Sequence, residues 1–118
     1  PLGPLVVGGF SQGGAMAQEM LQLPLADRIV GVVAMGTRLV REMELRLRLA
    51  ELEPKHLFWM HGEKDLRVSI QDGWAVAHVF ESAGWAMELI EHPKGHMIPM
   101  EHHEALKEWL TALSQIRL

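Results

Sequence analysis

The sequence predicts an α/β fold with a mainly parallel four-stranded sheet, crossover helices on one face and the C-terminal helix on the other. Four short apolar runs alternate with four segments of helical periodicity, a pattern typical of parallel sheets. Each apolar run is nearly continuous, as in strands that are covered on both faces. Because crossovers between parallel strands are right-handed, the first three helices should lie on the same face.

The chain is expected to form one domain over residues 1–118, because its length and 48% hydrophobic content suffice for one core and not for two. The strands are predicted from their apolar or β-branched centres. They cover residues 5–8, 29–35, 56–61 and 87–92.

The helices are predicted from their periodicity and from the residues that stop them. They cover residues 12–23, 40–52, 70–83 and 99–113. Pro24 and Pro54 should end the first two, since proline cannot extend a helix, and Gly84 should end the third. Proline at position 99 suits the first turn of the last helix.

Two helices carry expectations about their buried face. In 40–52, leucines alternate with charges as in a strand, but strong helix formers and a helical stripe favour a helix. The stripe expected to be buried consists of Val40, Met43, Leu47 and Ala50. The last helix is expected to bury Ala105, Leu106, Trp109, Leu110 and Leu113.

Composition argues against several classes of partner and site. The formal net charge is -4 and no basic run is present, so nucleic acid is not an expected partner. The chain has no cysteine, which excludes disulfides, zinc-thiolate sites and a cysteine nucleophile. No apolar segment approaches the roughly 18 residues of a membrane span, and no leader is recognisable, so we expect a cytoplasmic location.

A glycine-rich stretch separates the first predicted strand from the first predicted helix. Residues 9–13 read Gly-Phe-Ser-Gln-Gly, which matches the Gly-x-Ser-x-Gly pattern of a nucleophile elbow in its strand-turn-helix context. We expect Gly9 and Gly13 to avoid collisions in the tight turn and Ser11 to project from it. A phosphate-binding loop or a plain turn is the alternative.

Two other loops carry residues that would complete a serine nucleophile. A serine hydroxyl needs a base to accept its proton and an acid to orient that base. Asp65 follows the third predicted strand and His96 follows the fourth, so both should lie with Ser11 at the carboxyl edge of the sheet. Asp65 could instead cap a turn, Glu63 could be the acid, and His96 could have no role. We expect His61 to hold the loop by bonding to backbone.

These motifs resemble those of the phospholipase/carboxylesterase family of α/β-hydrolases, which includes the acyl-protein thioesterases. The resemblance rests on Gly-Gly-Phe-Ser-Gln-Gly-Gly-Ala at 8–15, His-Gly-Glu-Lys-Asp at 61–65 followed by Val68, and Gly-His at 95–96. It implies a truncated α/β-hydrolase fold and a serine carboxylesterase or thioesterase that hydrolyses small acyl esters. It further implies that Ser11 is the nucleophile, Asp65 the orienting acid and His96 the base.

The resemblance also implies that the backbone N–H of Gln12 is one oxyanion donor. Phe10 and Met97 adjoin the nucleophile and the base, so we expect them to bind substrate. No cofactor is expected. A metal site among the histidines near the end of the chain is not expected either, because adjacent His102 and His103 should point around a helix and not converge.

The chain departs from the family in lacking the strands that precede the elbow, so it is expected to be the C-terminal half of such a fold. Ser69 and the residues 92–94 also differ from the usual family pattern. The missing part normally supplies a second oxyanion donor, and losing one donor costs about 10²- to 10³-fold in rate. The strand at 5–8 would become an open edge, so we expect a homodimer or a companion chain to cover it. The alternative is an inactive fragment that serves as a dimerisation or binding module.

Overall fold

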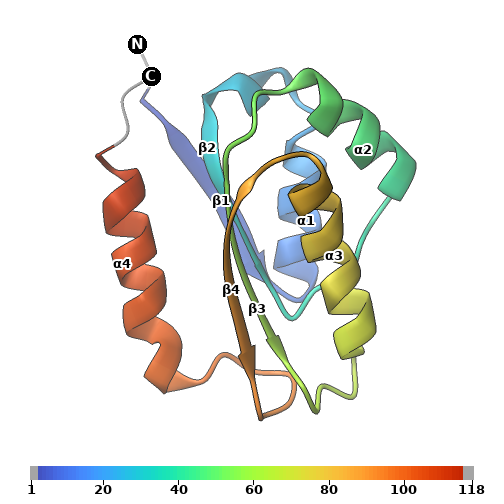
Figure 1. Ribbon diagram of the computed structural model, residues 1–118, viewed down its shortest axis with the longest axis vertical. Coiled ribbons are helices and arrows are strands. Elements are labelled where there is room, and N and C mark those ends of the chain that lie inside the picture. Colours follow the sequence, from blue (N-terminus) through green and yellow to red (C-terminus); the bar gives the residue numbers. More distant parts are fainter. Residues whose placement is uncertain (1–2, 116–118) are drawn as a thin grey trace.

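The computed structural model describes residues 3–115 and is built on a four-stranded parallel sheet (Figure 1). The strands follow the order β1-β2-β3-β4, so each pairs with its neighbours in the chain. They are β1 (Leu5–Phe10), β2 (Ile29–Met35), β3 (His56–Gly62) and β4 (Ala86–His92). All three pairings are parallel, which places the four carboxyl ends at one edge.

Helices cover both faces of the sheet, as the sequence predicted. Figure 1 shows α1, α2 and α3 on one face and α4 on the other. The helices are α1 (Gln12–Met20), η1 (Pro24–Arg28), α2 (Glu42–Glu51), α3 (Ile70–Ser82), η2 (Met100–His102) and α4 (His103–Leu113). Within residues 3–115, every helix is too short or too polar to cross a lipid bilayer.

Two hydrophobic clusters hold these layers together. The larger cluster lies between the sheet and α1, α2 and α3, and includes Leu57, Trp59 and Phe80. The smaller lies under α4, where Trp109 packs edge-on against Phe58 with ring centroids 5.6 Å apart. The sheet therefore has an apolar interior on both faces, which explains the continuous apolar runs of its strands.

The ends of two helices differ from the prediction. The first helix ends at Met20 and not at Leu23, and residues 24–28 form a separate 3-10 turn. The last segment begins with a 3-10 turn, because Pro99 has an extended ψ of 140° and precedes the helix. Gly84 has a φ of 87° just after α3, as expected of a helix stop.

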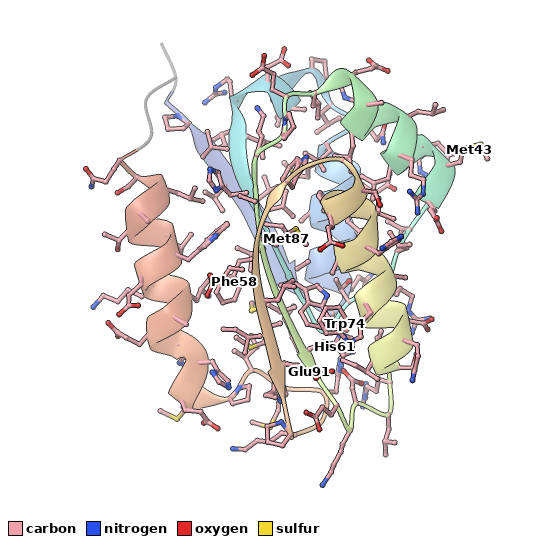
Figure 2. All side chains as sticks on the ribbon, in the orientation of Figure 1. Met43, Phe58, His61, Trp74, Met87 and Glu91 are labelled. Carbon is pink, nitrogen blue, oxygen red and sulfur yellow. The ribbon has the colours of Figure 1, made fainter. Side chains whose placement is uncertain are left out.

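The predicted buried face was wrong for α2, and for α4 it was wrong at one residue. Helix α2 buries Leu45 and Leu49, whereas Met43 and Leu47 are 71% and 63% exposed; Figure 2 shows Met43 pointing away from the sheet. The leucines of this helix belong to two possible stripes. Leu45 and Leu49, four residues apart, face the core, whereas Leu47 does not. In α4 the predicted face is confirmed at Ala105, Leu106, Trp109 and Leu113. Leu110 is exposed because the stripe that packs on the sheet lies beside it.

Candidate active site

Ser11 occupies a strained turn between β1 and α1. Its φ of 58° and ψ of -117° are unusual for a residue with a side chain, and Gln12 begins the helix directly afterwards. The Ser11 N–H donates to the carbonyl of Met35 at 2.8 Å, which fixes the turn to the end of β2. The hydroxyl therefore stands at the carboxyl edge of the sheet, at the start of a helix.

The glycines around Ser11 are constrained in different ways. A Cβ at Gly9 would lie 2.7 Å from the carbonyl carbon of Gly13, so a side chain there would collide with the helix, as expected. A Cβ at Gly13 would meet nothing within 4 Å, and the prediction for that residue was wrong. The crowded neighbour is Gly14, where a Cβ would lie 2.8 Å from the Cβ of Thr37.

The structure brings the Ser11 hydroxyl, the His96 ring and the Asp65 carboxylate into one hydrogen-bonded series. His96 Nε2 lies 3.0 Å from Ser11 Oγ, and His96 Nδ1 lies 2.7 Å from Asp65 Oδ2. The Asp65 side chain is almost fully buried, while the His96 side chain is 16% exposed. With the proton on Nδ1, the imidazole donates to the carboxylate and its Nε2 is free to accept from the serine.

The loop that carries Asp65 satisfies the other oxygen of the carboxylate. Asp65 Oδ1 accepts the backbone N–H groups of Arg67 and Val68, both at 2.8 Å. Burial alone would raise the pKa of Asp65, but the hydrogen bonds from Val68, His96 and Arg67 outweigh it and lower that pKa below its ordinary value of 3.8. The acid is therefore ionised near neutral pH and held in one orientation.

His61, near the end of β3, supports the same loop by a hydrogen bond to its backbone, as the sequence predicted. Its buried ring donates through Nε2–H to the carbonyl of Val68 at 2.8 Å. It lies between β3 and α3, near Trp74 (Figure 2). The ring fits because position 73 is glycine, where a Cβ would collide with the imidazole.

His92 ties the loop after β4 to the loop after β3. Its buried Nδ1 accepts the backbone N–H of Lys94 at 3.2 Å, and its carbonyl accepts the N–H of Glu63 at 2.8 Å. Burial, followed by the nearby His102, lowers the pKa of His92 below its ordinary value of 6.5. The neutral ring can therefore remain an acceptor, and the segment leading to His96 is anchored next to the Asp65 loop.

A cavity of about 220 Å³ opens beside the Ser11 hydroxyl. Its lining residues come from the start of α1, from the loop after β2 and from the Asp65 loop. They are Ser11, Gln12, Ala15, Thr37, Arg38, Val40 and Val68. As the first residue of α1, Gln12 has a backbone N–H without a partner inside the helix, and it adjoins Ser11.

The two residues expected to bind substrate, Phe10 and Met97, lie outside the lining of this cavity. The Phe10 ring packs against His96 with centroids 4.6 Å apart, and Met97 is 43% exposed; neither lines this cavity. Thr37 and Arg38 line it and were missed. Their position in the sequence could have indicated them, because they follow β2 and so lie at the same sheet edge as the other loops. Among residues 3–115, no three potential metal-ligating side chains are grouped.

Known proteins share this arrangement of sheet and helices. The family model described as Phospholipase/Carboxylesterase matches residues 2–114. Acyl-protein thioesterase 1 of Neurospora crassa is 30% identical over 119 residues, which cover 94% of this chain and 46% of that protein. The structure of acyl-protein thioesterase 2 of Zea mays superposes with a TM-score of 0.76 at 22% identity, covering 93% of this chain and 56% of that one.

Esterase PE8 superposes with a TM-score of 0.79 at 24% identity, covering 95% of this chain and 52% of that one. The chain thus spans about half the length of these relatives. The matched half contains the elbow, the sheet edge and the helices described above. The fold is a truncated α/β-hydrolase fold, and the chain belongs to the phospholipase/carboxylesterase family.

Proposed function

We propose that this chain is a serine carboxylesterase or thioesterase that hydrolyses small acyl esters. The observation that carries the proposal is the series from Asp65 through His96 to Ser11, with distances of 2.7 and 3.0 Å. A hydroxyl, an imidazole and an ionised acid in this order are the groups required for acyl transfer through a covalent intermediate. Membership of the family supports the same reaction class.

The proposed mechanism assigns one task to each group. His96 Nε2 accepts the proton of Ser11 as the oxygen attacks the ester or thioester carbonyl, and then gives that proton to the leaving group. Asp65 holds the ring through Nδ1–H and stabilises its positive charge. Water, activated by the same imidazole, then releases the acyl group from Ser11.

The developing oxyanion would be stabilised at the start of α1. The backbone N–H of Gln12 adjoins the nucleophile there and would be one donor. The family's second donor lies in a loop outside the half that this chain matches, so we propose that a further segment or a companion chain supplies it. We therefore expect an isolated chain to be slower by about 10²- to 10³-fold than a site with both donors.

A second candidate function is a catalytically inactive binding or dimerisation module. It is favoured by the position of β1 at the edge of the sheet, where the strand has one neighbour among residues 3–115. In either case we propose that a second copy or a companion chain covers the β1 edge. Labelling of Ser11 separates the two functions, because only the enzyme requires an activated hydroxyl.

The test compares the native chain with Ser11→Ala and with Ser82→Ala as a matched control on the exposed surface of α3. A fluorophosphonate should label the native chain and Ser82→Ala at Ser11, as located by peptide mass spectrometry, and should leave Ser11→Ala unlabelled. Hydrolysis of p-nitrophenyl acetate should follow the same pattern. Equal hydrolysis by the native chain and Ser11→Ala would remove the enzyme and leave the binding module.

A further inference from the structure

Arg38 places a cation on the wall of the cavity beside Ser11. The residue follows β2 at the carboxyl edge of the sheet and lines the cavity together with Ser11 and Gln12. Its guanidinium reaches the loop after β3, where Nη2 donates to the carbonyl of Arg67 at 3.1 Å. This bond uses one of the five donors of the side chain and leaves the others available.

A buried amide fixes the backbone of the segment that carries Arg38. Gln18 of α1 donates through Nε2 to the carbonyl of Arg38 at 2.9 Å, and its Oε1 accepts the N–H of Val40 at 3.2 Å. The Gln18 side chain is buried, so these bonds are shielded from water. Arg38 therefore extends from a defined backbone and not from a loose loop.

The charge of Arg38 has no carboxylate within 4.0 Å among residues 3–115, whereas Arg41 and Arg46 are each paired. Glu42 and Asp72 line a separate hollow together with Arg38, but neither lies within ion-pair distance of it, and Glu42 is paired with Arg46. Arg38 is exposed, and its place on the cavity wall next to Ser11, in a chain with a formal net charge of -4, suits its guanidinium to bind a carboxylate.

The remaining walls of the cavity suit a short aliphatic group. Ala15, Val40 and Val68 line it with apolar side chains. Its volume of about 220 Å³ is below the roughly 300–1,000 Å³ typical of sites for drug-sized ligands. This combination suits a ligand in which a few methylene groups separate the reacting carbonyl from a terminal anion. The methylene groups would contact the apolar wall, and the anion would reach the guanidinium.

We propose that Arg38 makes this site selective for esters whose acyl group ends in a carboxylate, such as half-esters of short dicarboxylic acids. The proposal rests on the assignment of Ser11 as nucleophile and specifies the class of substrate. The guanidinium binds the terminal carboxylate, the apolar wall contacts the methylene groups, and the ester carbonyl lies between Ser11 and the Gln12 N–H.

The test measures binding without turnover, using Ser11→Ala as the parent protein. Monomethyl glutarate and the uncharged dimethyl glutarate are titrated separately, and dissociation constants are taken from backbone amide shifts in two-dimensional NMR spectra. In the parent, the monoester should bind at least tenfold more tightly than the diester. Adding Arg38→Gln should weaken monoester binding about tenfold or more and leave diester binding unchanged, because a hydrogen-bonded charge is lost.

Two further variants sharpen the comparison. Lys107→Gln removes one positive charge from the exposed surface of α4, on the opposite face of the sheet, and should leave both affinities unchanged. Arg38→Lys keeps the charge without the planar fork and should retain part of the preference. Equal affinities for the two esters in the parent, no binding of the monoester, or an equal loss with Lys107→Gln would each overturn the proposal. Since the parent lacks the nucleophile, failed labelling of Ser11 would overturn the enzyme assignment separately.

Discussion

At the scale of the residue, Asp65 shows how one loop prepares a group for chemistry. Two backbone N–H groups bind Oδ1, which leaves Oδ2 directed at His96. The backbone groups and the imidazole therefore bind different oxygens of the carboxylate and do not compete for one acceptor. Its loop is held in turn by His61, whose ring binds the carbonyl of Val68.

We predict that Asp65→Asn lowers both stability and activity. The native pKa of Asp65 is depressed, so its ionised form stabilises the fold above about pH 3.8, and this contribution is lost as the pH falls through the lower folded-state pKa. The variant should lose about 1.5–3 kcal/mol of unfolding free energy at pH 7, as expected for hydrogen bonds to a charged group. Urea unfolding at a series of pH values measures the difference between the two proteins.

That difference should shrink as the pH falls below about 3.8, where the unfolded chain binds a proton at this position, and should be lost once the pH passes the lower pKa of the folded carboxyl. The rate of ester hydrolysis should fall about 10⁴-fold, because an amide does not orient and stabilise the imidazolium. Asp27→Asn, in the 3-10 turn before β2, is the control and should change neither property. A constant gap between the unfolding curves at all pH values would contradict the linkage.

The sequence predicted that Ser11, Asp65 and His96 lie together, because each follows a predicted strand and their residue types form a pattern known from serine hydrolases. It did not identify Thr37 and Arg38, since neither type marks a serine hydrolase and only the fold brings them to the cavity. Nor could it show that Gly14 is constrained in place of Gly13, because that depends on how closely Thr37 approaches the helix.

At the scale of the element, α2 illustrates the limit of periodicity. The strands were predictable because continuous apolar runs fit few other structures, and β2 was predicted with its observed bounds. Helix α2 carries leucines at 45, 47 and 49, which belong to two different stripes. Only the packing of the helix against its neighbours decides that Leu45 and Leu49 are buried.

This burial predicts a contrast between two chemically identical substitutions. Leu45 is 2% exposed, so Leu45→Ala should cost about 2–5 kcal/mol of unfolding free energy through lost burial and a cavity. Leu47 is 63% exposed, so Leu47→Ala should change stability by less than about 0.5 kcal/mol. Chemical denaturation of the two variants measures both values, and similar losses would show that the helix is packed by a different face.

At the scale of the whole molecule, the sheet has an apolar strand at its β1 edge. Among residues 3–115, strand β1 pairs with β2 alone, and Val6 is 38% exposed. An open edge presents unpaired backbone groups that favour association with another chain. A symmetric dimer that joins two such edges would be the simplest closed assembly.

We predict that the chain is a dimer at micromolar concentration. Val6→Lys should shift it toward monomer, because a charged side chain on an edge strand disfavours pairing. Met43→Lys adds the same charge on the outer surface of α2 and should leave the dimer intact. Size-exclusion chromatography with light scattering measures the masses. A native chain that is monomeric at this concentration would exclude the homodimer and leave the companion chain.

The strand order has a consequence for when the site exists at all. Ser11 follows β1 and His96 follows β4, the two outermost strands, 85 positions apart in the chain. Three strand spacings put those edges about 14 Å apart, so the segment leading to His96 must reach back across the sheet. A partly folded chain with β4 detached would keep its serine but lose the imidazole beside it. The reactivity of Ser11 would then report complete folding, because it would rise only when both outermost strands, β1 and β4, are paired in the sheet.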